Sequence, residues 1–254
     1  MGTFPDLFNQ KSMNKSENLD YGKNTLNVIS AADRFNRWMY EKIKPFCTGD
    51  ILEIGSGIGN ISRFFLQDGS SMVLSDLEEE YFGMLTERFS GNYSLKSIVQ
   101  LDFSDPDLEK HHPELIGKFD TVFALNVVEH IPDHHGALQN AGKLLKSGGK
   151  VIILVPAFHA LYNQFDFQLG HERRYTRKSL QTVLQDNGFK LIYSTYFNAV
   201  GILGWYFTGR ILGKKEIPSG QMKFYDTLVP VWKMVDLFMS KLAGLSVIQV
   251  GQKP

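Results

Sequence analysis

The sequence is poor in cysteine and has no net charge. It holds a single cysteine, Cys47, among 254 residues. An intramolecular disulfide, a Cys-x-x-Cys redox pair and a zinc cluster built from cysteines are therefore excluded. The charges cancel, with 27 Lys and Arg against 27 Asp and Glu. Because a chain without net charge exerts no long-range attraction on a polyanion, nucleic acid is not an expected partner and a small molecule is.

The sequence also lacks a long uninterrupted hydrophobic run. The longest stretch without a charged residue, 191–209, is nominally long enough to span a bilayer, but Tyr193, Asn198 and Gly204 interrupt it. Residues 1–20 are polar and mixed in charge, without the apolar core and cleavage site of a signal peptide. We therefore expect a cytoplasmic protein in a reducing compartment.

What the sequence does contain is an alternation of short apolar runs with helical patterns. Several of these runs are apolar on both faces, as are the strands of a sheet that is covered on both sides. Together they predict an α/β fold with a mostly parallel seven-stranded sheet and helices on both faces. The predicted strands are residues 51–54, 72–74, 97–101, 119–124, 151–155, 190–196 and 246–251.

Two segments fall outside this alternation. Residues 1–30 precede the first amphipathic pattern, and we expect them to form an N-terminal extension that is flexible or acts as a lid. Residues 31–254 are expected to form one domain. Within it, a segment at about 199–244 is rich in aromatic side chains and glycine. We interpret this segment as a helical insertion before the last strand.

The first predicted strand ends in a turn rich in glycine, with Gly55, Gly57 and Gly59 at every second position. Glycine accepts the backbone dihedrals of such a turn and lets a ligand approach the backbone closely. The dinucleotide-binding pattern Gly-x-Gly-x-x-Gly would require a glycine where Asn60 stands. This departure weighs against an NAD(P)-dependent oxidoreductase. An ordinary strand-to-helix turn is the other alternative.

Acidic residues stand at the ends of the next two strands. Asp76 ends the second predicted strand, and Asp102 follows the third. A carboxylate in the position of Asp76 can accept hydrogen bonds from both hydroxyls of a ribose. The alternative for Asp76 is the N-cap of the next helix, and for Asp102 it is a loop cap with Ser104 and Asp105.

With the pattern Glu-x-Gly-x-Gly-x-Gly beginning at Glu53, the sequence resembles the class I S-adenosylmethionine-dependent methyltransferases from about Trp38 to Val155. The resemblance implies a Rossmann-like methyltransferase fold, with S-adenosylmethionine as cofactor and S-adenosylhomocysteine as product. It also implies that Glu53 faces the cofactor's ammonium group, that Asp76 binds the ribose and that Asp102 binds the adenine. The implied cofactor-binding residues are Glu53, Gly55, Ser56, Gly57, Gly59, Asp76, Leu77, Asp102, Phe103 and Asn126.

Methyl transfer is an in-line displacement that requires two aligned substrates and, where the nucleophile carries a proton, a base. His130 is one catalytic candidate, because an imidazole accepts a proton near neutral pH. It lies in a Glu-His-Ile-Pro-Asp run that is similar to the quinone-biosynthesis O-methyltransferases. The alternative for His130 is a hydrogen bond within its own loop.

The second candidate segment is the Gly-His-x-Arg-Arg-Tyr run at residues 170–175, which resembles a bacterial subgroup of small-molecule methyltransferases. Within it, His171 is the other catalytic candidate. Adjacent arginines suit a carboxylate or phosphate on the acceptor, and a structural ion-pair cluster with Asp166 or Glu172 is the alternative. The expected acceptor-binding residues are Arg173, Arg174 and Tyr175.

No metal ion is expected from the sequence. Glu129, His130, His134 and His135 are crowded together, but they do not have the spacing of a known ligand set. We therefore expect a metal-independent reaction.

The sequence thus predicts a methyltransferase that uses S-adenosylmethionine and acts on a small-molecule acceptor, including a lipid-linked or sugar-like one. It does not specify whether oxygen, nitrogen or carbon is methylated. The alternatives are an NAD(P)-dependent oxidoreductase on a Rossmann sheet and a non-catalytic binding protein with a degenerate cofactor pocket.

The predicted insertion at 199–244 has three interpretations. It packs as a core or a lid over the acceptor, forms the contact of a homodimer, or attaches peripherally to a membrane surface. The lysines that would support membrane contact are Lys214, Lys215, Lys223, Lys233 and Lys241.

Overall fold

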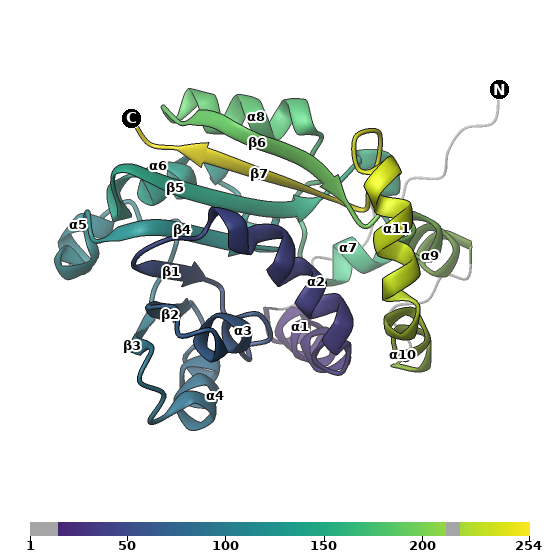
Figure 1. Ribbon diagram of the computed structural model, residues 1–254, viewed down its shortest axis with the longest axis horizontal. Helices are drawn as coiled ribbons and strands as arrows, with labels where there is room; N and C mark the ends of the chain where they lie inside the picture. Colours follow the sequence, from purple (N-terminus) through teal and green to yellow (C-terminus); the bar gives the residue numbers. More distant parts are fainter. Residues whose placement is uncertain (1–14, 212–218) are drawn as a thin grey trace.

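The computed structural model describes residues 15–211 and 219–254. They form a seven-stranded sheet with the strand order β3-β2-β1-β4-β5-β7-β6. Neighbouring strands are parallel except at β7, which runs antiparallel to both β5 and β6 (Figure 1). The strands are β1 (Ile51–Ile54), β2 (Met72–Asp76), β3 (Leu95–Gln100), β4 (Phe119–Leu125), β5 (Leu145–Pro156), β6 (Lys190–Phe197) and β7 (Ser246–Gln252).

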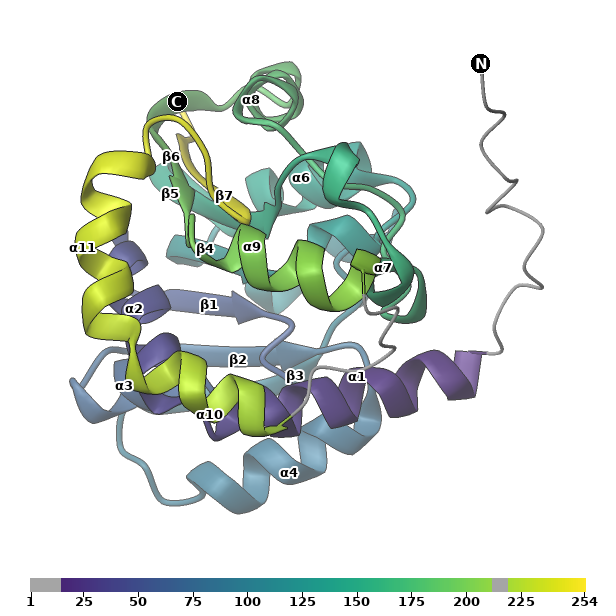
Figure 2. The same cartoon turned by 90° about the vertical axis from the view of Figure 1, so that its right-hand side faces the viewer.

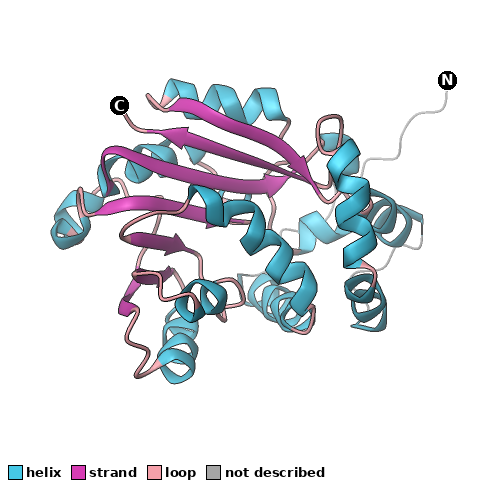
Figure 3. Cartoon of the chain, viewed as in Figure 1, coloured by secondary structure: helices cyan, strands magenta, loops and turns pink. Residues whose placement is uncertain are grey.

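Helices cover both faces of this sheet (Figure 3), which confirms the predicted fold class. Helices α6 and α8 pack on one face, and α3 and α4 pack on the other together with α2. The helices are α1 (Lys15–Ser30), α2 (Asp33–Ile43), α3 (Ser62–Gln67), α4 (Glu79–Phe89), α5 (Leu108–His111), α6 (His134–Leu144), α7 (Gln164–Gln168), α8 (Arg177–Asp186), α9 (Gly201–Trp205), α10 (Ser219–Thr227) and α11 (Val229–Met239).

The apolar strands explain why the sheet is covered on both sides. In β5, Val151 and Ile153 are buried in the hydrophobic cluster beneath α6 and α8. Their neighbours Ile152 and Leu154 are buried in the cluster beneath α2 and α3. Because successive side chains of a strand point to opposite faces, a fully apolar run contributes to two cores at once.

β5 begins earlier than its apolar run predicts. Phe119 of β4 pairs with Leu145, whereas Thr121 pairs with Lys150. The residues between these two pairs include Gly148, which has a φ of 77°. The expected turn before the strand is therefore a local irregularity within β5.

The predicted helical insertion before the last strand is also confirmed. Helices α9, α10 and α11, with a π-helical turn at Tyr206–Ile211, lie between β6 and β7 in the chain. They gather at the carboxyl ends of the parallel strands (Figure 1), and α1 lies at the same end. None of the helices within the described residues is long and apolar enough to cross a membrane. Lys214 and Lys215 lie outside the described residues.

Candidate active site

A cavity of about 770 Å³ opens at the carboxyl ends of the parallel strands. Figure 2 looks onto this end of the molecule, where α1, α7, α9 and α10 surround the strand ends. Ligands of open α/β sheets bind at this edge. The predicted site residues that line the cavity are Glu53, Gly55, Ser56, Gly57, Asp76, Leu77, Asp102, Phe103, Asn126, His130, His171 and Arg174, whereas Gly59, Arg173 and Tyr175 do not line it.

The glycine turn combines a strained backbone with open space. Gly57 has a φ of 52°, a region that side chains disfavour. A Cβ atom added there would lie 3.1 Å from Leu26 of α1 and near nothing else. Gly59 differs, because a Cβ atom there would collide with Phe89. Gly57 therefore leaves room for a ligand, and Gly59 allows the turn to pack against α4.

Asp76 is tied to this turn through its carboxylate. Its Oδ2 accepts a hydrogen bond from the backbone N–H of Gly57 at 2.8 Å, and its Oδ1 accepts one from Glu78 at 3.2 Å. The side chain is nearly buried, and burial raises the pKa of Asp76 against the lowering effect of these bonds. Each carboxylate oxygen has a further lone pair, so Asp76 can also accept hydrogen bonds from a ligand's hydroxyls.

Glu53 is a buried acid that lacks a cation. Its Oε2 accepts a hydrogen bond from the hydroxyl of Ser62, yet burial raises the pKa of Glu53 to about 8. Among the described residues, the one charged group that acts on it is Asp76, which raises this pKa further. A ligand that brings an ammonium group would supply the missing charge, and the methionine part of S-adenosylmethionine carries one. The site therefore fits this cofactor.

The part of the cavity expected to hold the adenine base lies at the end of β3. Asp102 uses Oδ1 to accept hydrogen bonds from the backbone N–H and the hydroxyl of Ser104, at 2.8 and 2.6 Å. This is the loop cap that the sequence allows, and Asp102 nevertheless lines the cavity. Phe103 is buried, while Leu77 across the cavity is 49% exposed. The three residues leave an apolar slot with one carboxylate at its edge.

Asn126 turns the chain from β4 toward the far end of the cavity. It has a φ of 55°, a conformation that asparagine tolerates better than other side chains. Its backbone N–H donates to the carbonyl of Leu154 at 2.8 Å. The turn leads into a short 3₁₀ helix, Val128–His130.

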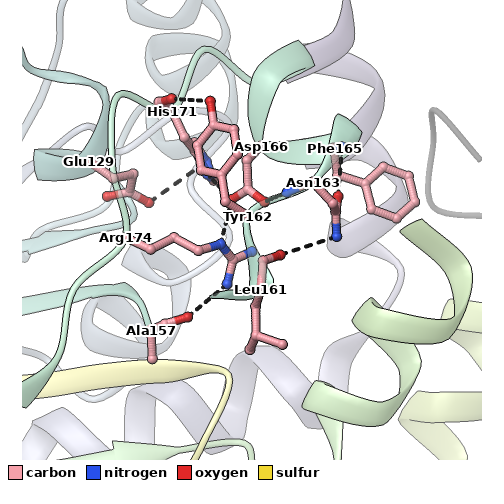
Figure 4. Close-up of polar contacts among 9 residues, drawn as sticks. All are labelled: Glu129, Ala157, Leu161, Tyr162, Asn163, Phe165, Asp166, His171 and Arg174. Carbon is pink, nitrogen blue, oxygen red and sulfur yellow. Dashed lines mark hydrogen bonds and ion pairs between the residues drawn. The ribbon is translucent and has the colours of Figure 1, made fainter. Parts of the chain in front are cut away.

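The far end of the cavity is organised around Asp166 of α7 (Figure 4). Its Oδ1 lies 2.8 Å from Nδ1 of His171 and accepts a hydrogen bond from Nε of Arg174 at 2.7 Å. Its Oδ2 accepts from the backbone N–H of Asn163 at 2.9 Å. Although burial opposes it, the pKa of Asp166 is lowered by the bonds and charges of His171 and Arg174. This carboxylate fixes the orientation of both side chains.

Glu129, His130 and His171 form a second group beside Asp166, which we call the Glu129 cluster. Nε2 of His171 lies 4.0 Å from Oε1 of Glu129, and the rings of His130 and His171 meet edge to face at 4.7 Å. Burial raises the pKa of Glu129 to about 8. His130 faces the cavity, and desolvation by the surrounding protein, together with the neighbouring His171, lowers the pKa of His130.

The three residues predicted to bind the acceptor are engaged in contacts within the chain. Arg173 donates to the carbonyls of Ile131 and Pro132, both at 2.9 Å. The Tyr175 hydroxyl lies 2.7 Å from Nδ1 of His134. Arg174 lines the cavity, but it is paired with Asp166 and donates to a backbone carbonyl at 3.0 Å. The structure thus brings only Arg174 of the three to the cavity.

Helix α1 lies within residues 1–30, which the sequence led us to expect as a flexible extension or a lid. Its residues Thr25, Leu26 and Ile29 line the cavity beside the glycine turn, and Asn60 donates to the carbonyl of Leu26 at 3.3 Å. These individual residues could not be named from the sequence, because the helix carries no motif and its position depends on tertiary packing.

Solved structures similar to this chain are methyltransferases. Phosphoethanolamine N-methyltransferase 2 of Haemonchus contortus, in complex with S-adenosyl-L-methionine, has a TM-score of 0.57 at 18% identity over 86% of this chain and 52% of that chain. A putative sarcosine dimethylglycine methyltransferase of Galdieria sulphuraria has a TM-score of 0.59 at 13% identity over 87% and 85%. At such identities the likeness shows a shared fold.

Curated relatives match a shorter region. The ubiquinone biosynthesis O-methyltransferase of Xanthomonas euvesicatoria is 31% identical over 103 residues, which cover 41% of this chain and 41% of that protein. The corresponding enzyme of Erwinia tasmaniensis is 25% identical over 114 residues, 45% of each. The chain thus matches less than half the length of these relatives.

A family model described as a methyltransferase domain matches residues 10–194, and the chain belongs to this family. It is a class I S-adenosylmethionine-dependent methyltransferase. This assignment replaces the oxidoreductase alternative left by the sequence.

Proposed function

We propose that this protein methylates an oxygen atom of a small-molecule acceptor that lies beside the Glu129 cluster. The observation that carries the proposal is the continuity of one cavity, which is lined both by the glycine turn and by Glu129, His130 and His171. The O-methyltransferase relatives support oxygen as the methylated atom.

In this proposal the end of the cavity lined by the glycine turn, which we call the cofactor end, binds S-adenosylmethionine. The far end, beside the Glu129 cluster, activates the acceptor. Glu53 pairs with the ammonium group of S-adenosylmethionine, Asp76 with its ribose, and Asp102 with its adenine. The cofactor supplies an electrophilic methyl group on a sulfonium. A lone pair of the acceptor oxygen forms the new C–O bond as the S–C bond breaks, and S-adenosylhomocysteine leaves. The hydroxyl proton leaves to water, and we assign His130 and His171 to orienting the acceptor oxygen for this step.

The acceptor should have an apolar part, because the cavity beyond the Glu129 cluster is lined by apolar side chains. Phe165 of α7 packs against Trp205 of α9 with ring centroids 5.1 Å apart. Met222 and Tyr225 of α10 add further apolar surface to the same wall. A lipid-linked acceptor suits this wall better than a bare sugar does.

The insertion also bears an exposed apolar stripe. In α11, Val231, Met234 and Phe238 recur at helical spacing and are 49%, 65% and 78% exposed. Leu242 continues the stripe and is 73% exposed. Lys241 lies beside it in the sequence and is also exposed. We propose that this stripe rests on an anionic membrane surface, because apolar and cationic side chains together suit a lipid interface.

The enzymatic proposal is tested by incubating the protein with S-adenosylmethionine and a panel of hydroxylated aromatic acceptors, with and without apolar tails. We expect S-adenosylhomocysteine and a methyl ether in equal amounts from at least one tailed acceptor. His171→Asn should lower kcat about a hundredfold and leave the affinity for S-adenosylhomocysteine unchanged. Methylation confined to nitrogen or carbon, or full turnover in both His130→Ala and His171→Asn, would contradict the proposal.

The membrane proposal is tested by co-sedimentation with neutral and anionic phospholipid vesicles. We expect binding to anionic vesicles alone, and loss of binding in Met234→Ser/Phe238→Ser. Tyr93→Ser is the matched control, because Tyr93 is an exposed aromatic residue, at 85%, near the start of β3. Self-association of the protein without vesicle binding, abolished by the same double substitution, would instead indicate a homodimer contact and overturn the membrane proposal.

A further inference from the structure

The residues of the Glu129 cluster converge as the ligands of a metal site do. One ligand atom from each of Glu129, His130 and His171 can be chosen so that all three lie within 4.8 Å of one another. We infer that these side chains bind a divalent transition-metal ion and that the acceptor oxygen completes its coordination. The second part of this inference rests on the proposed function, whereas the first part stands on the cluster alone.

The unpartnered carboxylate of Glu129 is the first argument. Its side chain is completely buried, and neither Oε1 nor Oε2 accepts a hydrogen bond from the described residues. A buried carboxylate without a partner is costly to the fold. The nearest ion-pair partner is Nε2 of His171, and at 4.0 Å it lies beyond hydrogen-bonding distance. An ion between the two groups would satisfy both.

The orientation of His171 is the second argument. Its Nδ1 lies 2.8 Å from the Asp166 carboxylate, so its Nε2 is the nitrogen that faces Glu129. Metal-binding histidines commonly donate their other ring N–H to a carboxylate, which fixes the tautomer and turns the remaining lone pair toward the ion. Arg174 donates to the same oxygen of Asp166, Oδ1, at 2.7 Å. This arrangement leaves Nε2 of His171 facing the cluster.

His130 completes the set from the cavity side. The backbone of Leu169 and Gly170 lies beside its ring. The side chain is exposed to the cavity, so an ion held here would be open to the acceptor.

The distances require a small contraction on binding. Ligand atoms at about 2.0 to 2.2 Å from a tetrahedral ion lie roughly 3.3 Å apart, whereas the free cluster extends to 4.8 Å. Glu129 and His130 can supply this movement by rotation of their side chains. His171 rotates less readily, because its Nδ1 is bonded to Asp166.

Two imidazoles and one carboxylate select for particular ions. This donor set suits Zn²⁺, Mn²⁺, Fe²⁺ or Co²⁺ rather than Ca²⁺, which prefers oxygen ligands. With three protein ligands the ion keeps open positions. An acceptor hydroxyl bound there would release its proton to water more easily, because the cation stabilises the resulting oxyanion. The oxyanion would then attack the cofactor's methyl group.

From the sequence we expected no metal ion, because Glu129, His130, His134 and His135 have no ligand spacing among themselves. The fold brings in His171 from the connection after β5 and directs His134 to Tyr175 instead. Three ligands from two distant segments carry no spacing rule that the sequence alone could display.

The metal site is tested by titrating Zn²⁺ and Mn²⁺ into the 254-residue protein after it has been stripped with a chelator and dialysed. We expect saturable binding of one ion per chain, weakened at least tenfold in Glu129→Gln and in His130→Ala. Glu129→Gln keeps the shape of the side chain, and His130→Ala alters a residue at the cavity surface, so both variants test the site without removing core volume. His159→Asn is the matched control, because His159 is an exposed histidine outside the cluster.

Co²⁺ supplies a second readout, since its visible absorption reports nitrogen and oxygen ligands directly. We expect the Co²⁺ spectrum of the wild type to change in His171→Asn. Absence of saturable binding, or equal affinity in wild type, Glu129→Gln and His130→Ala, would overturn the inference.

Affinity for S-adenosylhomocysteine is measured on the same samples to separate this inference from the proposed function. Retained cofactor binding and methyl-ether formation without metal binding would overturn the metal site alone. Stoichiometric metal binding with no methyl-ether formation from any acceptor would instead contradict the proposed function and leave the ion site in place.

Discussion

The two ends of the cavity are built on different principles. At the cofactor end, backbone groups donate hydrogen bonds to carboxylates near the strand ends, as Gly57 does to Asp76. Glu53 at this end remains without a cation. At the acceptor end, Asp166 is already paired with His171 and Arg174. The first end therefore depends on its ligand for charge balance, whereas much of the second is balanced within the protein. The predictions below test this difference.

The largest effect is expected for Gly57→Val at the cofactor end. Gly57 has a φ of 52°, and a Cβ atom would lie 3.1 Å from Leu26, so the branched side chain would strain the turn and fill the space left for the cofactor. Calorimetry should find affinity for S-adenosylhomocysteine reduced by more than about a thousandfold, or about 4 kcal/mol.

The control for backbone strain is Gly117→Val. Gly117 also has a left-handed φ, 65°, but a Cβ atom there would meet nothing within 4 Å. This variant should lose some stability and keep its cofactor affinity. Equal loss of affinity in both variants would mean that strain, rather than occupation of the site, explains the Gly57 result.

At the acceptor end, Arg174→Ala should act on stability. It removes a guanidinium that is almost fully buried and leaves the carboxylate of Asp166 with one partner fewer. Breaking a buried ion pair costs about 3 to 5 kcal/mol. Arg173→Ala, which removes two hydrogen bonds to backbone carbonyls at a half-buried site, should cost about 1 to 2 kcal/mol.

Denaturant unfolding monitors both arginine variants, with methyl transfer measured on the folded fraction. Should Arg174→Ala unfold like the wild type and only raise the acceptor's Michaelis constant, Arg174 would be a binding residue. The contrast between the two ends of the cavity would then weaken.

The same contrast decides what the sequence could predict. The cofactor end is built from residues that are close in sequence to the ends of strands. β1 and β2 are short buried strands. Gly55 and Gly57 follow β1 directly, and Asp76 is the last residue of β2, so their positions can be predicted once the strands are. For this reason the sheet, and most of the residues that line this end of the cavity, could be predicted from the sequence.

The acceptor end could not be predicted to the same degree, because its contacts join distant segments. Asp166 belongs to the five-residue helix α7, which is too short to show a period. The pairing of Arg173 with the carbonyls of Ile131 and Pro132 depends on how two connections fold over each other. The residue types in the 170–175 segment indicated contacts with a charged group. Only the tertiary structure distinguishes a side chain that lines the cavity from one that hydrogen-bonds to the loops around it.

A smaller effect on cofactor affinity is expected for Asp76→Ala. Loss of charge-assisted hydrogen bonds to the ribose should weaken S-adenosylhomocysteine binding by about 2 to 4 kcal/mol. Asp102→Ala is the comparison, since Asp102 is exposed and one of its oxygens already caps Ser104. It should cost about 1 kcal/mol. A ranking in which Asp102 exceeds Asp76 would require a different placement of the cofactor.

A more graded effect is a dependence of cofactor affinity on pH through Glu53. In the free protein burial raises the pKa of Glu53 to about 8, with Asp76 adding to the effect and the hydroxyls of Ser62 and Ser56 opposing it. The carboxyl group is therefore protonated at pH 6. Pairing with the ligand's ammonium group requires the carboxylate, so binding must release this proton, and affinity rises with pH until about pH 8.

Between pH 6 and 7.5 the affinity for S-adenosylhomocysteine should rise by more than about tenfold, because each pH unit below the pKa changes it by nearly a factor of ten. Calorimetry in two buffers of different ionisation enthalpy would detect the released proton directly. Glu53→Gln keeps the shape of the side chain and should bind more weakly with a flat pH profile. If the variant kept the wild-type slope, the titrating group would be Asp76, whose pKa is also raised, and Glu53 would not be the partner of the ammonium group.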